Sequence, residues 1–423
     1  MTDALDILVV SQFFSPEMGA PAARFHDFGR LLVERGHRVR IITGFPNSPS
    51  GIVADGYRNR LVQREWIDGI EVLRGWLYAS PRLTGVTKSL GFGTFALSAS
   101  MRAVLDRPKA DVVIATSPPP TVGIPGMLAA RLLGAPLVFD VRDIWPEAIA
   151  ASGRLQSGLL IRFLESIESA IYRNAAAVTV VTDGKRTRLI EKGVPGSKVA
   201  VIPNGVDLGR FEELTIDRDQ LLARYGLDPA AFIVLYAGIF NPAQGLDVLL
   251  DAAKNLRRTR ASSTRPVQFA LVGGGSQRER LFRRITEEEL HSDVVLVPEQ
   301  PRESIPPLLC AADAIAVTLR KRRDTHTIPS KIYESMASGR PVLVSADGAV
   351  ADIVNESRAG IATPAEDAEA LAAAITRLCE DPSHAEELGR RGRDHAATHD
   401  RRVIVDRFEQ VLHQAVSGAP SRG

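Results

Sequence analysis

Short runs of β-branched and other apolar residues alternate with segments of helix length along this chain, and this alternation constrains its fold most strongly. In the first half the runs lie at 7–10, 39–43, 112–116, 137–141, 178–182 and 199–202. Apolar runs separated by helical patterns are typical of buried parallel strands joined by crossover helices. The first half therefore predicts a doubly wound α/β domain.

The same alternation begins again after Gly205. The second series of runs lies at 232–237, 269–272, 294–297, 314–319 and 341–345. Pro203-Asn204-Gly205 has the residue types of a turn, and a chain of 423 residues is longer than one hydrophobic core supports. We therefore predict two Rossmann-like, doubly wound parallel-sheet domains facing a cleft, at 1–205 and 206–399. The polar end, 417–423, is expected to be a disordered tail.

Composition and charge narrow the classes of function. Lys plus Arg total 52 and Asp plus Glu total 50, so the net charge of +2 gives no general case for nucleic-acid binding. Cys310 and Cys379 alone support neither a disulfide framework nor a zinc site with four ligands. The start of the chain lacks a secretory pattern, and no apolar run is long enough to span a membrane. We expect a cytoplasmic enzyme without a nucleic-acid partner.

The segment 85–105 has two interpretations. Its apolar residues are interrupted by Lys88, serines and Arg102, so the pattern is amphipathic. One interpretation is an ordinary helix packed on a core. The other is a surface that contacts a membrane or a lipid-linked substrate, which would put the protein at the inner face of the plasma membrane.

Ligands of open α/β sheets bind beyond the carboxyl ends of the strands, so the loops there form the candidate site. These loops are 11–19, 116–120, 140–147, 238–245, 273–275, 298–300 and 320–334. Gly273-Gly274-Gly275 precedes a helix that begins near Arg278, and backbone N–H groups at such a helix start favour an anion. A tight turn without a ligand is the alternative.

The loop 320–334 is the richest in charge. Arg320 and Arg323 lie near a helix start at Pro329, and positive charge together with a helix N-terminus stabilises a diphosphate. Lys331 and Glu334 are three residues apart and share a helix face. They could form a surface ion pair, or Lys331 could contact phosphate while Glu334 accepts both hydroxyls of a ribose.

The loop 140–147 carries a second concentration of polar and aromatic groups. Arg142, Asp143, Trp145 and Glu147 follow a buried strand within a few positions of one another. Such density is typical of a site, although any single member could serve a structural ion pair.

Several motifs occur in an order and spacing that resemble the family-4 retaining glycosyltransferases. They are Pro16-Glu17-Met18-Gly19, Pro203-Asn204-Gly205-Val206-Asp207, Gln244-Gly245-Leu246-Asp247, Val272-Gly273-Gly274-Gly275 and the segment 329–341. Asp143-Ile144-Trp145-Pro146-Glu147 is similar to the branch that transfers amino-deoxy sugars in bacterial surface polysaccharides. The resemblance covers nearly the whole chain.

The resemblance implies a GT-B fold with an acceptor-binding first domain and a nucleotide-sugar-binding second domain. It implies a last helix, 400–416, that crosses back to the first domain, and neither metal nor cofactor. With the residues singled out above, the expected donor-binding set is Gly19, Gly238, Gln244, Gly273, Gly274, Arg278, Val297, Pro298, Glu299, Arg320, Arg323, His326, Ser330, Lys331 and Glu334. The expected catalytic residues are Arg142, Lys331 and Glu334, and the expected acceptor-side residues are Glu17, Asp143, Trp145 and Glu147.

Four positions depart from the family pattern. His326 stands where the family has the first of two glutamates, the second being Glu334. Phe240 and Gln244 stand where many members have Arg and Lys. Arg142 stands where a His is common. The diphosphate must therefore find its cations elsewhere, and we expect Lys331 and the arginines of the loop 320–323 to supply them.

The expected reaction transfers a sugar from a nucleoside diphosphate sugar, UDP being the expected nucleotide, to an acceptor hydroxyl with retention. The acceptor is a small molecule or a lipid-linked sugar, and the expected role is cell-surface polysaccharide or glycolipid synthesis. One alternative is a UDP-sugar 2-epimerase of the same fold, and a second is a natural-product glycosyltransferase. A two-domain solute-binding protein is the alternative from a non-enzymatic class.

Overall fold

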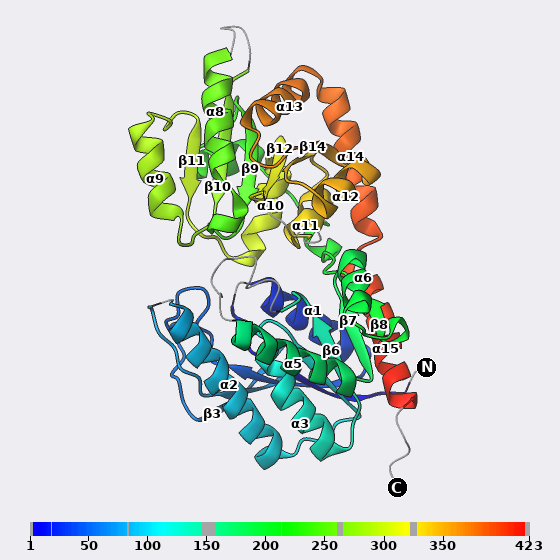
Figure 1. Cartoon of the computed structure of the whole chain (residues 1–423). Helices are drawn as coiled ribbons and strands as arrows, with labels where there is room; N and C mark the ends of the chain where they lie inside the picture. Colours follow the sequence, from blue (N-terminus) through cyan, green and yellow to red (C-terminus); the bar gives the residue numbers. More distant parts are fainter. Residues whose placement is uncertain are drawn as a thin grey trace. The chain divides into compact units, whose positions relative to one another are not determined.

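The chain folds into two compact units in a computed structural model that describes residues 3–17, 19–82, 84–145, 158–212, 214–259, 265–321 and 328–418 (Figure 1). Unit 1 consists of Met1–Asn204 and Arg401–Gly423, and unit 2 consists of Gly205–Asp400. The chain passes from unit 1 to unit 2 after Asn204, within the turn Pro203-Asn204-Gly205.

Unit 1 contains an eight-stranded sheet in the order β3-β4-β2-β1-β5-β6-β7-β8. The strands are β1 (Asp6–Ser11), β2 (Arg38–Gly44), β3 (Val62–Ile67), β4 (Ile70–Gly75), β5 (Val112–Thr116), β6 (Leu137–Val141), β7 (Ala177–Val180) and β8 (Val199–Val201). All neighbours pair in parallel except β3, which is antiparallel to β4. The parallel sheet predicted for the first half is therefore confirmed, with one antiparallel edge strand added.

The hairpin of β3 and β4 was not predicted from the sequence. Asp68 and Gly69 connect the two strands and both have positive φ, 47° and 78°. An Asp-Gly pair of this kind is a strong hairpin signal. The signal was masked because β3 alternates exposed and half-buried residues, while the other strands of this sheet are mostly buried and form clear apolar runs.

Helices cover both faces of this sheet. They are α1 (Ala20–Glu34), α2 (Gly85–Asp106), α3 (Gly123–Leu133), α5 (Gly158–Asn174), α6 (Asp183–Glu191) and α15 (Arg401–Ser417). Helix α15 packs on α1, where the rings of Phe28 and Phe408 are 5.3 Å apart between centroids. Helices α2, α3 and α5 cover the other face through Phe95, Ala129 and Ile171. The last helix includes Ser417, so the tail predicted from residue 417 begins too early; residues 419–423 lie outside the described ranges.

Unit 2 contains a six-stranded, wholly parallel sheet in the order β11-β10-β9-β12-β13-β14. Its strands are β9 (Phe232–Ala237), β10 (Val267–Val272), β11 (Val294–Val297), β12 (Ala314–Thr318), β13 (Val342–Ser345) and β14 (Gly360–Thr363). The second predicted parallel sheet is confirmed. The edge strand β14 was missed because Gly360 and Ala362 make its apolar run short and weak.

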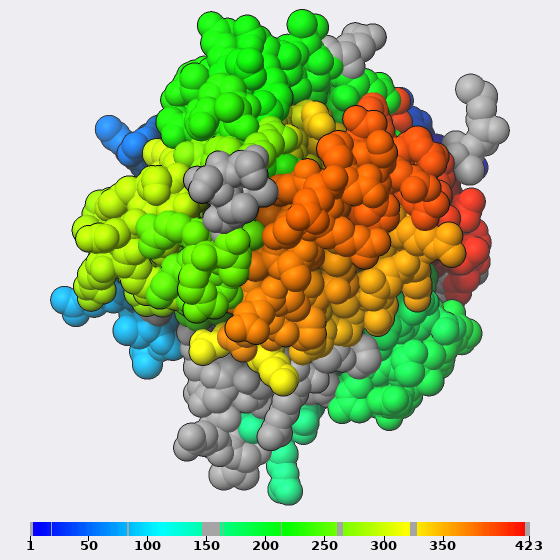
Figure 2. Space-filling model, turned by 90° about the horizontal axis from the view of Figure 1, so that it is seen from above, coloured from blue at the N-terminus to red at the C-terminus, as the bar shows by residue number. Residues whose placement is uncertain are grey.

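Two layers of helices enclose the sheet of unit 2. The helices are α7 (Arg218–Arg224), α8 (Asp247–Thr259), α9 (Arg278–Glu287), α10 (Ile305–Ala311), α11 (Lys331–Ala337), α12 (Ala349–Ser357), α13 (Ala368–Glu380) and α14 (Pro382–Ala397). Helices α8, α9 and α13 pack on one face through Leu249, Leu281 and Leu371. Helices α10 and α11 pack on the other face through Leu309 and Ile332. Figure 2 shows the side chains of α13 and α14 as a continuous surface beside α8, which α13 contacts.

Short 3₁₀ helices complete the described elements, at Pro120–Val122, Gly196–Lys198, Leu208–Phe211, Pro242–Gln244 and Arg302–Ser304. No helix of the described ranges is long and apolar enough to cross a membrane.

Candidate active site

The loops after β9, β10, β11 and β12 lie at one edge of the unit 2 sheet because these strands are parallel. Backbone hydrogen bonds join the loops: Gly238 N donates to Val272 O at 3.0 Å, and Gly273 N donates to Val297 O at 3.1 Å. Arg320 N donates to Ala243 O at 3.0 Å. The structure therefore brings together the second-half loops that the sequence singles out.

The glycines of this edge are required by close backbone packing. Gly273 has φ 147°, and a Cβ there would lie 2.0 Å from Gly238 O. A Cβ at Gly275 would lie 2.6 Å from Phe240 O. The tight turn considered as an alternative for Gly273-Gly274-Gly275 is thus real. The absence of a side chain lets the backbones of these neighbouring loops pack against each other.

Lys331 reaches from α11 across the sheet edge to the end of β9. Its Nζ donates to Tyr236 Oη at 2.7 Å and to Gln244 Oε1 at 3.0 Å. A Cβ on Gly238 would lie 2.6 Å from the same Nζ. The sequence analysis missed Tyr236, whose signal is a single polar group near the carboxyl end of a buried apolar strand.

The electrostatics of Lys331 are unusual for a lysine. Among the described residues it forms no ion pair, so the surface pair with Glu334 considered from the sequence is absent. Burial lowers the pKa of the Lys331 ammonium to about 7, and the Glu334 carboxylate acts in the opposite direction. Burial also raises the pKa of Tyr236, which stays a neutral phenol. The ammonium is therefore held by neutral oxygens and is available to an anion.

The other predicted cations of unit 2 have different environments. Arg278 Nη1 donates to Gly273 O at 2.9 Å and to Val297 O at 3.3 Å, which fixes its guanidinium at the ends of β10 and β11. Arg320 is exposed and pairs with Glu366 at 3.3 Å, so part of its charge is already compensated. Arg323 and His326 lie outside the described residues.

The remaining predicted donor residues of unit 2 surround the same edge. Val297 ends β11 and is buried, while Pro298 and Glu299 are exposed in the loop that follows. Glu299 Oε2 lies 3.4 Å from where a Cβ on Gly274 would be. Ser330 precedes α11, and Glu334 is half-buried in its first turn. Glu334 and Lys331 thus stand on one short helix beside the glycine loops.

The carboxyl edge of the unit 1 sheet is built on a buried charge cluster. Asp140 is fully buried and accepts hydrogen bonds from Thr116 Oγ1 at 2.9 Å and Thr179 Oγ1 at 2.7 Å. It also pairs with Arg24 at 3.2 Å. Arg401 pairs with Asp27, and both side chains are buried. This cluster could not be predicted from the sequence because its members come from α1, three strands and α15.

Arg142 lies beside this cluster and has no carboxylate within ion-pair distance in the described part of the chain. Its Nη1 donates to Ala20 O at 2.7 Å, at the start of α1, where Gly19 is the N-cap residue. Burial and the nearby Arg24 lower the pKa of Arg142 to about 10, so it stays charged at neutral pH. This edge of unit 1 therefore carries a fixed positive charge.

Glu17 has a structural explanation. Its carboxylate accepts backbone hydrogen bonds from Phe14 at 3.2 Å, Asn47 at 2.8 Å and Ser48 at 2.9 Å, which joins the loops after β1 and β2. Burial raises the pKa of Glu17 to about 7, against the effect of these donors. If Glu17 also contacts the acceptor, as expected from the sequence, its carboxylate must bind the acceptor and these three N–H groups at the same time.

The other predicted acceptor-side residues lie at the end of β6. Asp143 pairs with the buried Lys185 at 3.3 Å. Trp145 Nε1 is buried without a hydrogen-bond partner in the described ranges, and Glu147 falls outside them.

Two groups of residues could suggest a metal. The triplet Asp217-Arg218-Asp219 matches an Asp-x-Asp pattern, but Asp217 caps α7 by accepting Gln220 N at 3.1 Å, and Arg218 pairs with Asp313. In unit 1, His37 and His413 flank Glu409. His37 Nδ1 accepts Leu5 N at 3.0 Å, so its Nε2, facing Glu409, carries the proton and offers no lone pair. Neither group carries a case for a metal.

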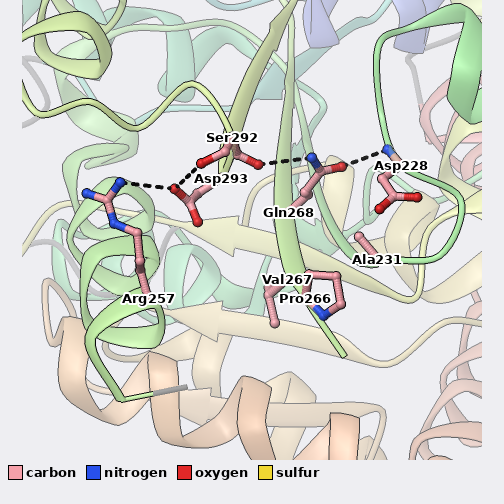
Figure 3. Close-up of a pocket in the computed structure, with 8 residues that line it drawn as sticks. All are labelled: Asp228, Ala231, Arg257, Pro266, Val267, Gln268, Ser292 and Asp293. Carbon is pink, nitrogen blue, oxygen red and sulfur yellow. Dashed lines mark hydrogen bonds and ion pairs between the residues drawn. The ribbon is translucent and has the colours of Figure 1, made fainter. Parts of the chain in front are cut away.

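A pocket of about 610 Å³ opens at the opposite, amino edge of the unit 2 sheet (Figure 3). Its polar groups pair with one another: Arg257 with Asp293 at 3.5 Å, and Gln268 with the backbone of Ser292 at 3.0 Å and Asp228 at 2.8 Å. Because these groups are satisfied and lie away from the glycine loops, the pocket is no candidate for the chemistry.

Comparison with known proteins agrees with the two-unit architecture. Residues 19–205 match the family described as "Glycosyl transferase 4-like domain", and residues 217–395 match "Glycosyl transferases group 1". WcaI of Escherichia coli (strain K12), assigned as a glycosyl transferase to colanic acid biosynthesis, is 28% identical over 90% of this chain and 93% of its own length. A GDP-mannose-dependent phosphatidylinositol monomannoside mannosyltransferase of Mycolicibacterium smegmatis is 30% identical over 53% of this chain and 58% of its own length.

A solved structure extends the likeness to the whole fold. HepE of Anabaena, in complex with UDP-glucose, superimposes with a TM-score of 0.70 at 20% identity, over 97% of this chain and 99% of that one. The fold and the matched families define a nucleotide-sugar glycosyltransferase of GT-B type. Within that class, the chain belongs to the family-4 glycosyltransferases.

Proposed function

We propose that this enzyme transfers a sugar from a nucleoside diphosphate sugar to an acceptor hydroxyl with retention of configuration and without a metal. The observation that carries the proposal is the Lys331 ammonium, held by the neutral oxygens of Tyr236 and Gln244 beside the glycine loops. A cation that pairs with no carboxylate of the described residues, at the ligand-binding edge of a parallel sheet, suits a leaving diphosphate.

In this proposal unit 2 binds the donor. Lys331 and the backbone N–H groups at Ser330 and Lys331 contact the phosphates, Glu334 accepts the ribose hydroxyls, and the loop 297–299 contacts the base. UDP is the proposed nucleotide. The relatives point in two directions, since HepE is known with UDP-glucose while the mannosyltransferase is GDP-mannose-dependent. The nucleotide must therefore be tested directly.

The order of the proposed steps follows from the negative charge that develops on the leaving diphosphate. Neutralising the diphosphate lowers the barrier to its departure, and the acceptor then attacks from the same face while its proton passes to a phosphate oxygen. A double displacement would need a carboxylate on the opposite face of the sugar. His326 stands where the family places the first glutamate, so that route has no evident nucleophile. Isolation of a covalent glycosyl-enzyme would contradict the same-face route.

Unit 1 is the proposed acceptor domain. Arg142 and the loop that contains Asp143 and Trp145 would contact the acceptor. We propose a role in cell-surface polysaccharide or glycolipid synthesis with an amino-deoxy sugar and a lipid-linked acceptor. The similarity to WcaI, assigned to colanic acid biosynthesis, supports the polysaccharide role.

The test is thermal stabilisation of the full chain by UDP, GDP, dTDP, ADP and CMP in the presence of a chelator. A ligand that binds only the folded state raises the unfolding midpoint by mass action. Stabilisation by one diphosphate, lost in Glu334→Ala, would support the donor site. Absence of stabilisation by all five would contradict it. A 2-epimerase would convert its nucleotide sugar without any acceptor, which nuclear magnetic resonance of the sugar detects.

A further inference from the structure

Helix α2 is apolar on two opposite faces. Gly91, Phe95 and Ala99 are buried against the sheet of unit 1. On the other side Val86, Leu90, Leu97, Met101 and Leu105 are 71%, 48%, 64%, 51% and 64% exposed. Successive members of this exposed set are four or seven residues apart, so they form one stripe along the helix. Burial against the sheet explains the first face, whereas the described residues of unit 1 leave the second face exposed.

Aromatic side chains extend this stripe beyond the helix. Tyr78 is 38% exposed, and its backbone N donates to Thr94 Oγ1 of α2 at 2.9 Å. Trp66 of β3 is 67% exposed. A Cβ on Gly75 of β4 would meet Ser98 of α2, so Gly75 faces this helix. Glu71 lies four residues before Gly75 and therefore faces the same side of the sheet. Trp66 pairs with Glu71 across the two strands and lies on that side too.

More than half of the exposed large apolar side chains in the described residues belong to the segment 61–105. Isolated exposed apolar residues are ordinary, whereas a gathered patch with Trp and Tyr at its border is typical of a docking surface. Trp and Tyr are the residues enriched at membrane–water interfaces.

The charge around α2 identifies the occupant. Between residues 82 and 109 the basic residues are Arg82, Lys88, Arg102, Arg107 and Lys109, and Asp106 is the acidic one. Positive charge therefore stands at both ends of the apolar stripe. Arg102 pairs with Asp106 at 3.6 Å and Lys109 pairs with Asp6 at 3.5 Å, while Arg82, Lys88 and Arg107 form no ion pair with another described residue.

A second copy of this chain is a poor match for this surface. A two-fold axis would bring the same patch of two copies together, and either orientation of α2 would then place basic ends against basic ends. An anionic bilayer surface instead attracts clustered Lys and Arg and accepts the apolar stripe among its acyl chains.

We infer that the α2 stripe, with Trp66 and Tyr78 at its border, docks this enzyme on an anionic lipid bilayer without spanning it. Helix α2 begins after β4 ends, so its Val86 end lies at the carboxyl edge of the unit 1 sheet, where the proposed acceptor loops also are. Docking there would give a lipid-linked acceptor a short path to the site. That last consequence rests on the proposed function; the docking itself does not.

The test is sedimentation of the full chain with vesicles of phosphatidylcholine, with or without phosphatidylglycerol. We expect binding to the anionic vesicles, at least about tenfold weaker binding by Leu97→Ser/Met101→Ser, and loss of the anionic preference in Arg82→Glu/Lys88→Glu. The matched controls are Phe282→Ser on α9, which is 59% exposed, and Arg390→Glu on α14. Both controls should bind as the unchanged protein does.

Three results would overturn the inference. They are no binding of the unchanged chain to anionic vesicles, equal binding by Leu97→Ser/Met101→Ser, and a dimer by light scattering that this variant dissociates. Nucleotide stabilisation of each variant without vesicles keeps the two proposals separate. A chain that binds vesicles but no nucleotide would contradict only the proposed function, and the reverse would contradict only the docking surface.

Discussion

The Lys331 ammonium lies 2.7 Å from the Tyr236 phenol although 95 positions separate the two residues along the chain. The phenol comes from the end of a buried strand, and the ammonium comes from the first turn of a helix after the fourth strand of the sheet. Their contact puts a cation at the end of β9. This is the part of the chain where the family pattern has Arg and Lys and this sequence has Phe240 and Gln244.

Removing the Lys331 charge should abolish most of the transfer activity and most of the affinity for the nucleoside diphosphate. Lys331→Met keeps the length of the side chain and loses the ammonium, so we expect about a hundredfold loss of transfer rate and of nucleoside diphosphate affinity. Calorimetric titration with the nucleotide that stabilises the unchanged enzyme measures the affinity. Arg390→Met is the control, because Arg390 lies on α14, is exposed and pairs with Asp394. Equal losses in both variants would contradict a special role for Lys331.

The pKa of Lys331 predicts a pH dependence. Burial lowers it from 10.5 to about 7 in the folded protein, so the folded state releases this proton at lower pH than the unfolded chain does. Between these values the unfolded chain binds more protons, and the free energy of unfolding should therefore rise with pH from about 7 upward. Nucleotide affinity should change in the opposite sense and fall as pH rises above 7, since binding needs the ammonium form. Titrations from pH 6 to 9 check both slopes, and both should flatten in Lys331→Met.

Gly273 should tolerate no side chain. Gly273→Ala places a Cβ 2.0 Å from Gly238 O at φ 147°, and we expect a loss of about 3 kcal/mol in the free energy of unfolding. The cost of Gly273→Ala could come from the clash with Gly238 or from the positive φ. Gly134→Ala is the comparison, because Gly134 has φ 61° and a Cβ there would meet no atom within 4 Å. This substitution should cost only about 1 kcal/mol. Urea unfolding measures both. Similar costs would mean that backbone conformation, and not contact between the loops, explains the glycine.

The buried cluster of unit 1 should be essential for folding. Asp140→Ala leaves Arg24 buried without its carboxylate, and we expect a loss of about 3–5 kcal/mol. Asp394→Ala breaks an exposed pair with Arg390 and should cost less than about 0.5 kcal/mol. Urea unfolding of the two variants compares them directly, and a mild effect of Asp140→Ala would contradict the role assigned to the cluster.

Two of the three strands that were not predicted share one property. Val62–Ile67 and Gly360–Thr363 are edge strands, and neither is uniformly buried. The third, Ile70–Gly75, is buried inside its sheet, but Glu71 and Arg74 interrupt its apolar run. A strand buried on both faces must be apolar at every position, which gives a signal within the strand itself. An edge strand is specified largely by its neighbour, so its own residues are less restricted.

The alternation of apolar runs by itself determined the two parallel sheets, the turn near Gly205 between them and the loops at their carboxyl edges. It could do so because strand burial, helix periodicity and turn chemistry act over a few neighbouring residues. Only the tertiary structure decided which side chains meet at those edges. Lys331 contacts Tyr236 instead of pairing with Glu334, Glu17 is engaged by backbone N–H groups, and Arg24 and Arg401 neutralise Asp140 and Asp27. These partners lie far apart along the chain, and the packing of helices on the sheets brings them together.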